Sequence, residues 1–188
     1  AIDFIGNMPA HEEGTQFSKE KGRVLEEIKR YVQLGGAEGY IEAGGRRFTL
    51  TPGTFLCERD HSWGIRRGGG VPETGVQPGE IPVGYLHNFV AVQFPAWGAT
   101  FHLREDHDGK RLVQSGGLVR AAGKESHITG ISHDYTCRKD IRQVTGGAIE
   151  IVADDGTAKK MTCRALSPLY LRAGGYFGYK DFVHGLWK

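Results

Sequence analysis

The chain has 188 residues, a length typical of a single domain that buries most of the surface its unfolded form exposes. Its 24 basic and 22 acidic residues are interspersed and leave a formal net charge of +2, so the composition excludes the strongly basic surface that binds nucleic acid or an anionic membrane. The 29 glycines separate short runs of β-branched and aromatic residues, which favours many strands joined by turns.

The cysteines and the apolar runs indicate the compartment. Cys57, Cys137 and Cys163 lie far apart without a CxxC pair, which argues against a zinc ribbon or a disulfide framework and favours reduced thiols inside a cell. No apolar run approaches the roughly 20 residues of a membrane helix, and the N-terminal residues lack a signal-peptide pattern. We therefore expect a soluble, cytoplasmic protein with no membrane span.

The first fifty residues predict strands, with one ambiguity. A short strand covers residues 1–6 and is ended by Pro9. Four apolar residues between 24 and 32 also fit a helical stripe, but the sequence after them is typical of a hairpin around Gly44-Gly45, so we favour strand from Ile28 onward. Pro52-Gly53 then turns the chain into its most informative segment.

That segment is TFLCERDHSWGIRR, residues 54–67. Its apolar run, residues 55–57, reads as the end of a buried strand that delivers charged residues to a strand end. A long loop rich in glycine and proline follows over residues 66–82, and we predict that it is a lid over a site. Its glycines are not a phosphate cradle, because no Lys-Ser/Thr pair and no helix pattern follow them.

After Pro82 the sequence predicts a series of strands with explicit turns. The strands cover residues 85–94, 99–105, 111–120, 126–137, 147–153, 159–165 and 169–173. Asp-Gly pairs at 108–109 and 155–156 are typical of tight hairpins. Antiparallel strands of this number and length predict an all-β fold, a closed or nearly closed barrel or a sandwich, and such barrels hold lipophilic ligands.

The motif RDHSWG, residues 59–64, resembles the DHxWG signature of the lipocalin-like AttH/CrtC superfamily, which includes carotenoid 1,2-hydratases and kievitone-hydratase-like proteins. The pieces PAHEE at 9–13 and RYVQ at 30–33 are similar to bacterial relatives that carry the same motif. Members typically have two lipocalin-like lobes with the motif near the start of the second half. The resemblance thus implies a single lipocalin-like domain over residues 1–188, equivalent to the second lobe of a longer protein.

The residue types of the motif suit a hydratase, dehydratase or isomerase that needs no cofactor. A carboxylic acid kept protonated in an apolar pocket can protonate a double bond, while a histidine takes a proton from water and an aromatic face stabilises the cation. We therefore predict Asp60 and His61 as catalytic residues that act on a lipophilic substrate such as a terpenoid, steroid or polyketide. The predicted substrate-binding residues are Trp63, Arg59, His11, Glu12, Tyr85 and His87.

Alternation along a strand restricts this prediction. Asp60 and His61 can both face one pocket only if the chain bends between them, for which Gly64 and the polar crowding are suitable. Without a bend, Asp60 remains the acid and His61 becomes an orienting residue. Glu58 would then share the side of Asp60, and Arg59 would share the side of His61.

Other interpretations remain open. Asp60 and Ser62 could form an ordinary turn, with an unusual backbone angle at Gly64 and Trp63 in the core. The protein could also be a non-catalytic carrier of lipophilic molecules, in which Asp60, His61 and Trp63 orient the ligand or brace the barrel. A zinc or iron site would use the His11-Glu12 and Asp60-His61 pairs, but their spacing matches no strong metal motif, so we predict no metal. The aromatic residues after position 169 could line a cavity or, more readily, pack in a core, against a missing first lobe or in a homodimer.

Overall fold

The computed structural model describes residues 1–20, 22–65, 86–141 and 143–168, and in these ranges every regular element is a β-strand. The prediction of an all-β, antiparallel barrel or sandwich is confirmed. No helix in the described ranges is long and apolar enough to cross a membrane. The predicted lid at 66–82, the end of the strand series at 169–173 and the C-terminal aromatic residues lie outside the described residues.

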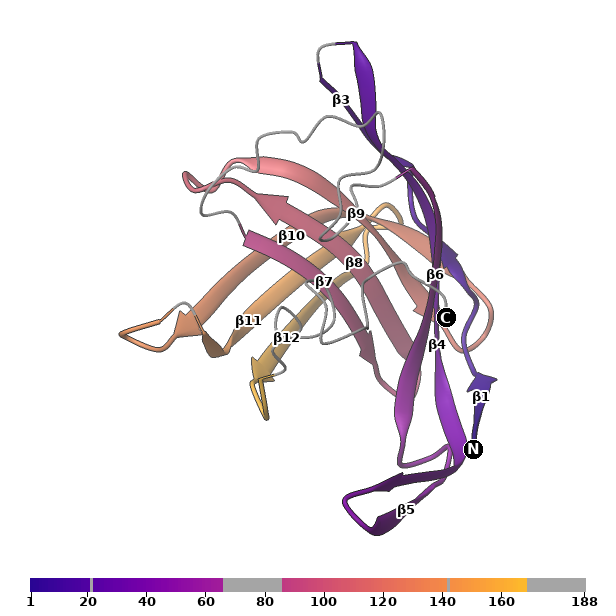
Figure 1. Ribbon diagram of the computed structural model, residues 1–188. Coiled ribbons are helices and arrows are strands. Elements are labelled where there is room, and N and C mark those ends of the chain that lie inside the picture. Colours follow the sequence, from indigo (N-terminus) through magenta and orange to yellow (C-terminus); the bar gives the residue numbers. More distant parts are fainter. Residues whose placement is uncertain (21, 66–85, 142, 169–188) are drawn as a thin grey trace.

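The first sheet is built on one long strand, β4, which resolves the ambiguity after residue 23 in favour of strand. Three short strands pair with β4 in succession, and β5 and β6 also pair with it, all antiparallel. Figure 1 shows β3 and β5 projecting from opposite ends of β4. The strands are β1 (Ile2–Gly6), β2 (His11–Glu12), β3 (Gln16–Glu20), β4 (Arg23–Ala43), β5 (Arg46–Leu50) and β6 (Leu56–Ile65).

The second sheet is an antiparallel meander in the order β12-β11-β10-β9-β8-β7, and it curls into a half-barrel beside β4 and β6 (Figure 1). Its turns follow the predicted chemistry, since Gly109 and Gly156 both have the positive φ that tight hairpins require. The strands are β7 (Leu86–Gln93), β8 (Trp97–Glu105), β9 (Arg111–Arg120), β10 (Glu125–Cys137), β11 (Val144–Ala153) and β12 (Ala158–Arg164).

The main hydrophobic core lies inside the curl of the second sheet. It brings together buried residues of β8, such as Phe101 and Leu103, with residues of the more distant strands β11 and β12, including Ile151 and Met161. The other face of β8 meets the first sheet, where Leu34 of β4 packs with Met8 and Val119. Because β8 is buried on both faces, polar side chains on its second face are enclosed between the two sheets.

One expectation about the motif segment is wrong. Residues 55–57 do not end a buried strand, because β6 begins at Leu56 and the side chains of Phe55 and Leu56 are 40% and 56% exposed. The segment is apolar because it borders a surface groove, described below, rather than because it lies in the core. The charged residues of the motif therefore occupy the middle of β6, between the turn at Pro52-Gly53 and the strand's end at Ile65.

Candidate functional site

The motif strand β6 pairs regularly at Asp60 and His61. It pairs with β4 residue by residue from Leu56 to Ile65 without a register shift. Alternate residues of an uninterrupted strand face opposite sides of the sheet, and residues directly paired across two strands share a side. Asp60 is paired with Val32, which is buried, whereas His61 is paired with Tyr31. The two predicted catalytic residues therefore point to opposite faces of the first sheet.

The outer face of β6 carries an aromatic set formed by Tyr31, His61 and Trp63. The ring of His61 stacks on Tyr31 with centroids 5.3 Å apart and lies 5.6 Å from the ring of Trp63. Trp63 is 46% exposed, so it is not a core residue. The Arg59 guanidinium shares this face and donates a hydrogen bond of 2.9 Å to the Tyr31 hydroxyl. Glu12, paired with Tyr31, is also exposed.

The inner face of β6 places Asp60 in a chain of charges. Asp60 Oδ1 lies 3.1 Å from Arg30 Nε, and the other end of the same guanidinium, Nη1, lies 3.5 Å from Glu13 Oε2. Arg30 also lies over the ring of Phe89 from β7, 4.7 Å from its centroid, so the charge is enclosed on the side of the second sheet. Asp60 thus acts on the site through Arg30, as an ion-pair partner at its solvent-facing edge.

The segment at the end of β2 supplies two buried ionisable residues. His11 and Glu13 are 2% and 4% exposed, while Glu12 between them points to the other side, as alternation requires. The Glu13 backbone N–H donates to the Arg30 carbonyl over 2.9 Å, which keeps this segment against β4. Burial raises the pKa of the Glu13 carboxyl, although Arg30 and His11 oppose that shift. Glu13 is therefore the carboxyl of this cluster that retains its proton more readily than a solvated one.

His11 reaches from the first sheet to the second, where its Nδ1 pairs with the Glu125 carboxylate of β10. A carboxylate can only accept, so Nδ1 carries a proton, and in the neutral tautomer the lone pair of the ring lies on Nε2. Gly117 of β9 makes room for the ring, because a Cβ on that residue would collide with it. The His11 ring also meets the edge of His127 at 6.4 Å between centroids.

On β8, His102 completes a cluster of polar side chains between the two sheets. We call it the enclosed cluster; its residues are His11, Glu13, Gln16, Arg30 and His102. The Gln16 amide nitrogen lies 2.8 Å from His102 Nδ1 and 3.3 Å from Glu13 Oε2, so it donates to both and links the two sheets. Burial, with His87 adding to the effect at 4.6 Å between ring centroids, lowers the pKa of His102 to about 3. Burial also lowers the pKa of His87. Both imidazoles are therefore neutral at physiological pH.

Four buried side-chain atoms of this cluster lack a hydrogen-bond partner among the residues that the structure describes. They are His11 Nε2, Glu13 Oε1, His102 Nε2 and Arg30 Nε, the last of which lies in the ion pair with Asp60. Buried polar atoms in folded proteins are almost always satisfied by protein or by ordered water. A carboxyl group and two imidazoles with free hydrogen-bonding capacity are thus buried between the sheets, where a water molecule or a polar group of a ligand would satisfy them.

The structure divides the predicted site residues between the two faces. It brings His11 into the cluster between the sheets, with Asp60 and His87 at the exposed edge of that cluster, and it leaves His61, Trp63, Arg59 and Glu12 on the outer face. Tyr85 lies outside the described residues. Sequence reasoning missed Glu13, Gln16, Arg30, His102 and Glu125. The spacing His11-Glu12-Glu13 and the alternation of polar and apolar residues from Thr100 to Arg104 were the available signals.

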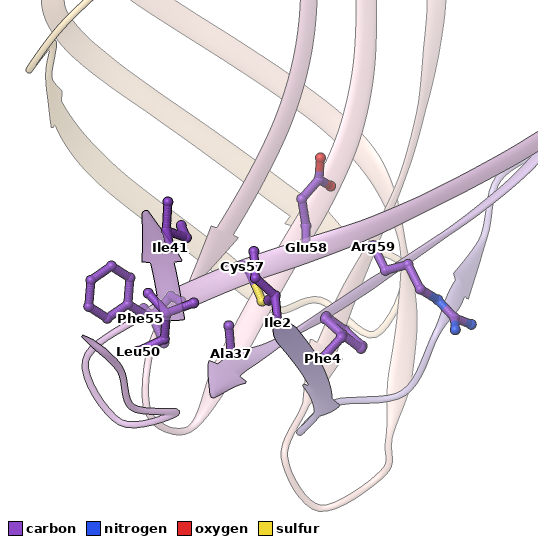
Figure 2. Close-up of a pocket in the computed structure, with 10 residues that line it drawn as sticks. Ile2, Phe4, Ala37, Ile41, Leu50, Phe55, Cys57, Glu58 and Arg59 are labelled. Atoms are coloured by element: carbon purple, nitrogen blue, oxygen red, sulfur yellow. The ribbon is translucent and has the colours of Figure 1, made fainter. Parts of the chain in front are cut away.

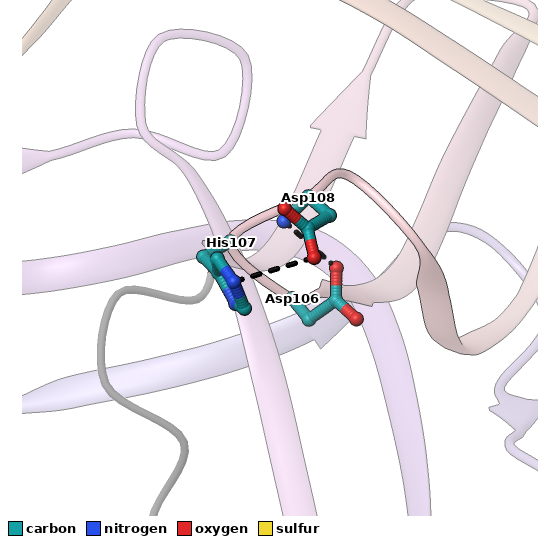
Figure 3. Close-up of side chains that lie close together, drawn as sticks. All are labelled: Asp106, His107 and Asp108. Carbon is teal, nitrogen blue, oxygen red and sulfur yellow. Dashed lines mark hydrogen bonds and ion pairs between the residues drawn. The ribbon is translucent and has the colours of Figure 1, made fainter.

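A separate set of metal-ligand types lies in the hairpin between β8 and β9. Within the described residues, ligand atoms of Asp106, His107 and Asp108 come within 4.8 Å of one another (Figure 3). Asp106 Oδ1 already accepts the backbone N–H groups of Asp108 and Lys110, at 3.0 and 2.9 Å. This carboxylate organises the turn, and the exposed hairpin is explained by that structural role.

The comparison with protein families gives one match. The model of a family of unknown function, DUF8625, matches residues 1–188. The chain belongs to this family. No curated protein and no solved structure matches the chain.

Proposed function

We propose that the protein is a cofactor-independent acid–base enzyme, a hydratase, dehydratase or isomerase, and that its reaction takes place at the cluster between the two sheets. One observation carries the proposal: Glu13 and His11 lie buried on the same side of one short segment, and each has an unpartnered atom suited to proton transfer. Acid and base groups placed in this way are the machinery that addition of water to a double bond requires.

The chemistry assigns different roles to the two residues. Glu13, whose pKa is raised by burial, donates its proton to one alkene carbon, and a water molecule attacks the cation that forms on the other carbon. His11 Nε2 takes the proton released by that water, and Glu125 at Nδ1 holds the imidazole in the required tautomer. The product is an alcohol, and transfer of one proton from His11 to Glu13 through solvent restores the starting state.

The remaining residues position this pair. Arg30 is held between Asp60 and Glu13, so Asp60 sets the place of the guanidinium and is a positioning residue rather than the acid. Gln16 fixes the orientation of both Glu13 and the neutral His102. The resemblance of the RDHSWG motif to the AttH/CrtC superfamily supports a lipophilic alkene as the substrate class.

The test compares two adjacent carboxylates, the buried Glu13 and the exposed Glu12. The full chain is incubated with a panel of terpenoid, steroid and polyketide alkenes in 18O-labelled water, and mass spectrometry detects substrates that gain one labelled water. We expect Glu13→Gln to lower turnover of an active substrate by about 100-fold or more. The matched control Glu12→Gln, on the outer face, should keep wild-type turnover. A Glu13→Gln variant with full turnover would exclude Glu13 as the acid.

A further inference from the structure

A groove on the outer face of the first sheet is separate from the enclosed cluster. Its volume is about 390 Å³, within the range of about 300–1,000 Å³ typical of small-molecule sites. Apolar side chains from β1, β4 and β5 and from the turn before β6 form most of its wall, as Figure 2 shows: Ile2, Phe4, Ala37, Ile41, Leu50 and Phe55. Cys57, Glu58 and Arg59 of β6 form the rest together with Leu56.

Several of the large apolar side chains that line the groove are exposed to solvent. Ile2, Ile41, Phe55 and Leu56 are between 40% and 57% exposed, although they lie together around one concavity. Clustered exposure of large apolar side chains marks surfaces that bind a ligand or a partner. The groove therefore provides the hydrophobic part of a binding site.

Arg59 provides the polar part. Its guanidinium lies over the rings of Phe4 and Tyr31, 5.9 and 5.3 Å from their centroids, and it donates to the Tyr31 hydroxyl. No carboxylate among the described residues forms an ion pair with it. A guanidinium has five N–H donors in a planar fork that suits a carboxylate, so most of its donors remain free for a ligand.

Glu58, which also borders the groove, does not neutralise Arg59. The two side chains are neighbours on one strand, and Figure 2 shows Glu58 directed away from Arg59. Glu58 instead lies on the side of Asp60, and burial and the Asp60 charge raise the pKa of its carboxyl. Arg59 is therefore the cation of the groove wall, without an ion pair among the described residues, and Glu58 points away from it.

We propose that this groove binds a long-chain carboxylate, with the hydrocarbon chain along the apolar wall and the carboxylate paired with Arg59. Charge complementarity selects this occupant, since the groove is apolar along its length and cationic at one end. The site goes beyond the reaction proposed above and is independent of it. Arg59 and Asp60 face opposite sides of β6, so a ligand on Arg59 does not touch the enclosed cluster.

Isothermal titration calorimetry with two probes of equal chain length tests the site. The full chain is titrated with dodecanoate and with dodecanol, below the concentration at which either forms micelles or a separate phase. We expect wild type to bind dodecanoate, and Arg59→Gln to weaken that binding by about tenfold or more through loss of a charge-assisted pair. Dodecanol should bind more weakly than dodecanoate to wild type and should be insensitive to Arg59→Gln.

Matched variants keep the result interpretable. Arg47→Gln removes an equal charge from an exposed arginine of β5 that pairs with Glu42, and it should leave dodecanoate binding unchanged. Arg59→Lys should restore part of the affinity, and Glu13→Gln should leave it at the wild-type level, which separates this site from the proposed reaction. Circular dichroism and urea unfolding establish that each variant is folded.

Three outcomes would overturn the proposal. The first is that dodecanoate fails to bind the wild type, as it would if another part of the chain or a second copy covered the groove. The second is that dodecanol binds as tightly as dodecanoate, which would show that Arg59 does not recognise the carboxylate. The third is a dimer, seen by analytical ultracentrifugation, that Ile41→Ser dissociates and dodecanoate does not, which would assign the groove to an interface.

Discussion

At the scale of single residues, the burial of Glu13 is unfavourable for the stability of the ionised protein but favourable for acid chemistry. Its carboxyl is enclosed between two sheets, and burial outweighs the attraction of Arg30 and raises its pKa. A buried carboxyl that must ionise destabilises the fold, whereas the protonated form can serve as an acid. Such a residue is expected at a functional site rather than at a purely structural position.

The linkage between protonation and folding predicts the sign of a pH effect. Near the unfolded pKa of about 4.5, the unfolded chain releases the Glu13 proton before the folded protein does. Stability due to this residue is therefore fully present in acid and is lost as the pH rises through the folded pKa. We expect Glu13→Gln to gain stability relative to wild type as the pH is raised from 4 toward about 7.

Thermal unfolding of both proteins across this pH range measures the effect. The difference in Tm between Glu13→Gln and wild type should increase with pH, while Glu12→Gln, at an exposed site, should follow wild type throughout. If instead the Tm of wild type rose relative to that of Glu13→Gln as the pH increased, the attraction of Arg30 would outweigh burial, and the raised pKa of Glu13 would be wrong.

At the scale of elements, β6 places two carboxylates, Asp60 and Glu58, on the same face but gives them different neighbours. Asp60 on its inner face has Arg30 as a partner, while Glu58 on the same face has the charge of Asp60 nearby without an ion pair among the described residues. Arg30 is thus an ion-pair partner of Asp60, whereas burial and the Asp60 charge disfavour the ionised form of Glu58. The difference can be measured by neutralising each in turn.

We expect Asp60→Asn to destabilise the protein by about 1 kcal/mol, since the Asp60 side chain is 34% exposed and such pairs are partly screened. Glu58→Gln should leave stability unchanged or increase it, because its ionised form is disfavoured by burial and by Asp60. Urea unfolding at pH 7 gives both free energies. Equal destabilisation by the two changes would contradict the assignment of Asp60 as the partner of Arg30.

The elements themselves were largely predictable, because turn chemistry and alternation are local. The glycines at 44–45, 109 and 156 fixed three hairpins, and alternation correctly placed Glu58 with Asp60 and Arg59 with His61. The error at residues 55–57 arose because an apolar run does not distinguish a core from a surface groove.

The enclosed cluster was only partly predictable, because it depends on contacts between distant parts of the chain. Gln16 meets His102 across 86 positions, and His11 meets Glu125 across 114. No local pattern states which strands will face each other, so a histidine on an apolar strand is indistinguishable from an isolated polar residue. His11 was found because a motif drew attention to its segment, and His102 was missed for lack of one.

At the scale of the whole molecule, the cluster exists only where the two sheets meet, and a small apolar contact holds them together beside it. Leu34 of β4 is 2% exposed and packs with Met8 and Val119, and Gly98 of β8 lies directly against it. A Cβ added to Gly98 would collide with the end of the Leu34 side chain and would lie 2.9 Å from the carbonyl oxygen of Val92. The spacing of the sheets therefore depends on this glycine and this leucine together.

A double-mutant cycle tests that dependence. Leu34→Ala should cost about 2–5 kcal/mol by leaving a cavity, and Gly98→Ala should cost about 1–3 kcal/mol by overpacking the same contact. In the double variant the new methyl group no longer meets Leu34, so the combined cost should be smaller than the sum by at least about 0.5 kcal/mol. Urea unfolding measures all four free energies, and Gly53→Ala, where a Cβ meets nothing within 4 Å, is the control for the added methyl group. Strictly additive costs would mean that Gly98 and Leu34 act independently, and that the sheets are held at their spacing by other contacts.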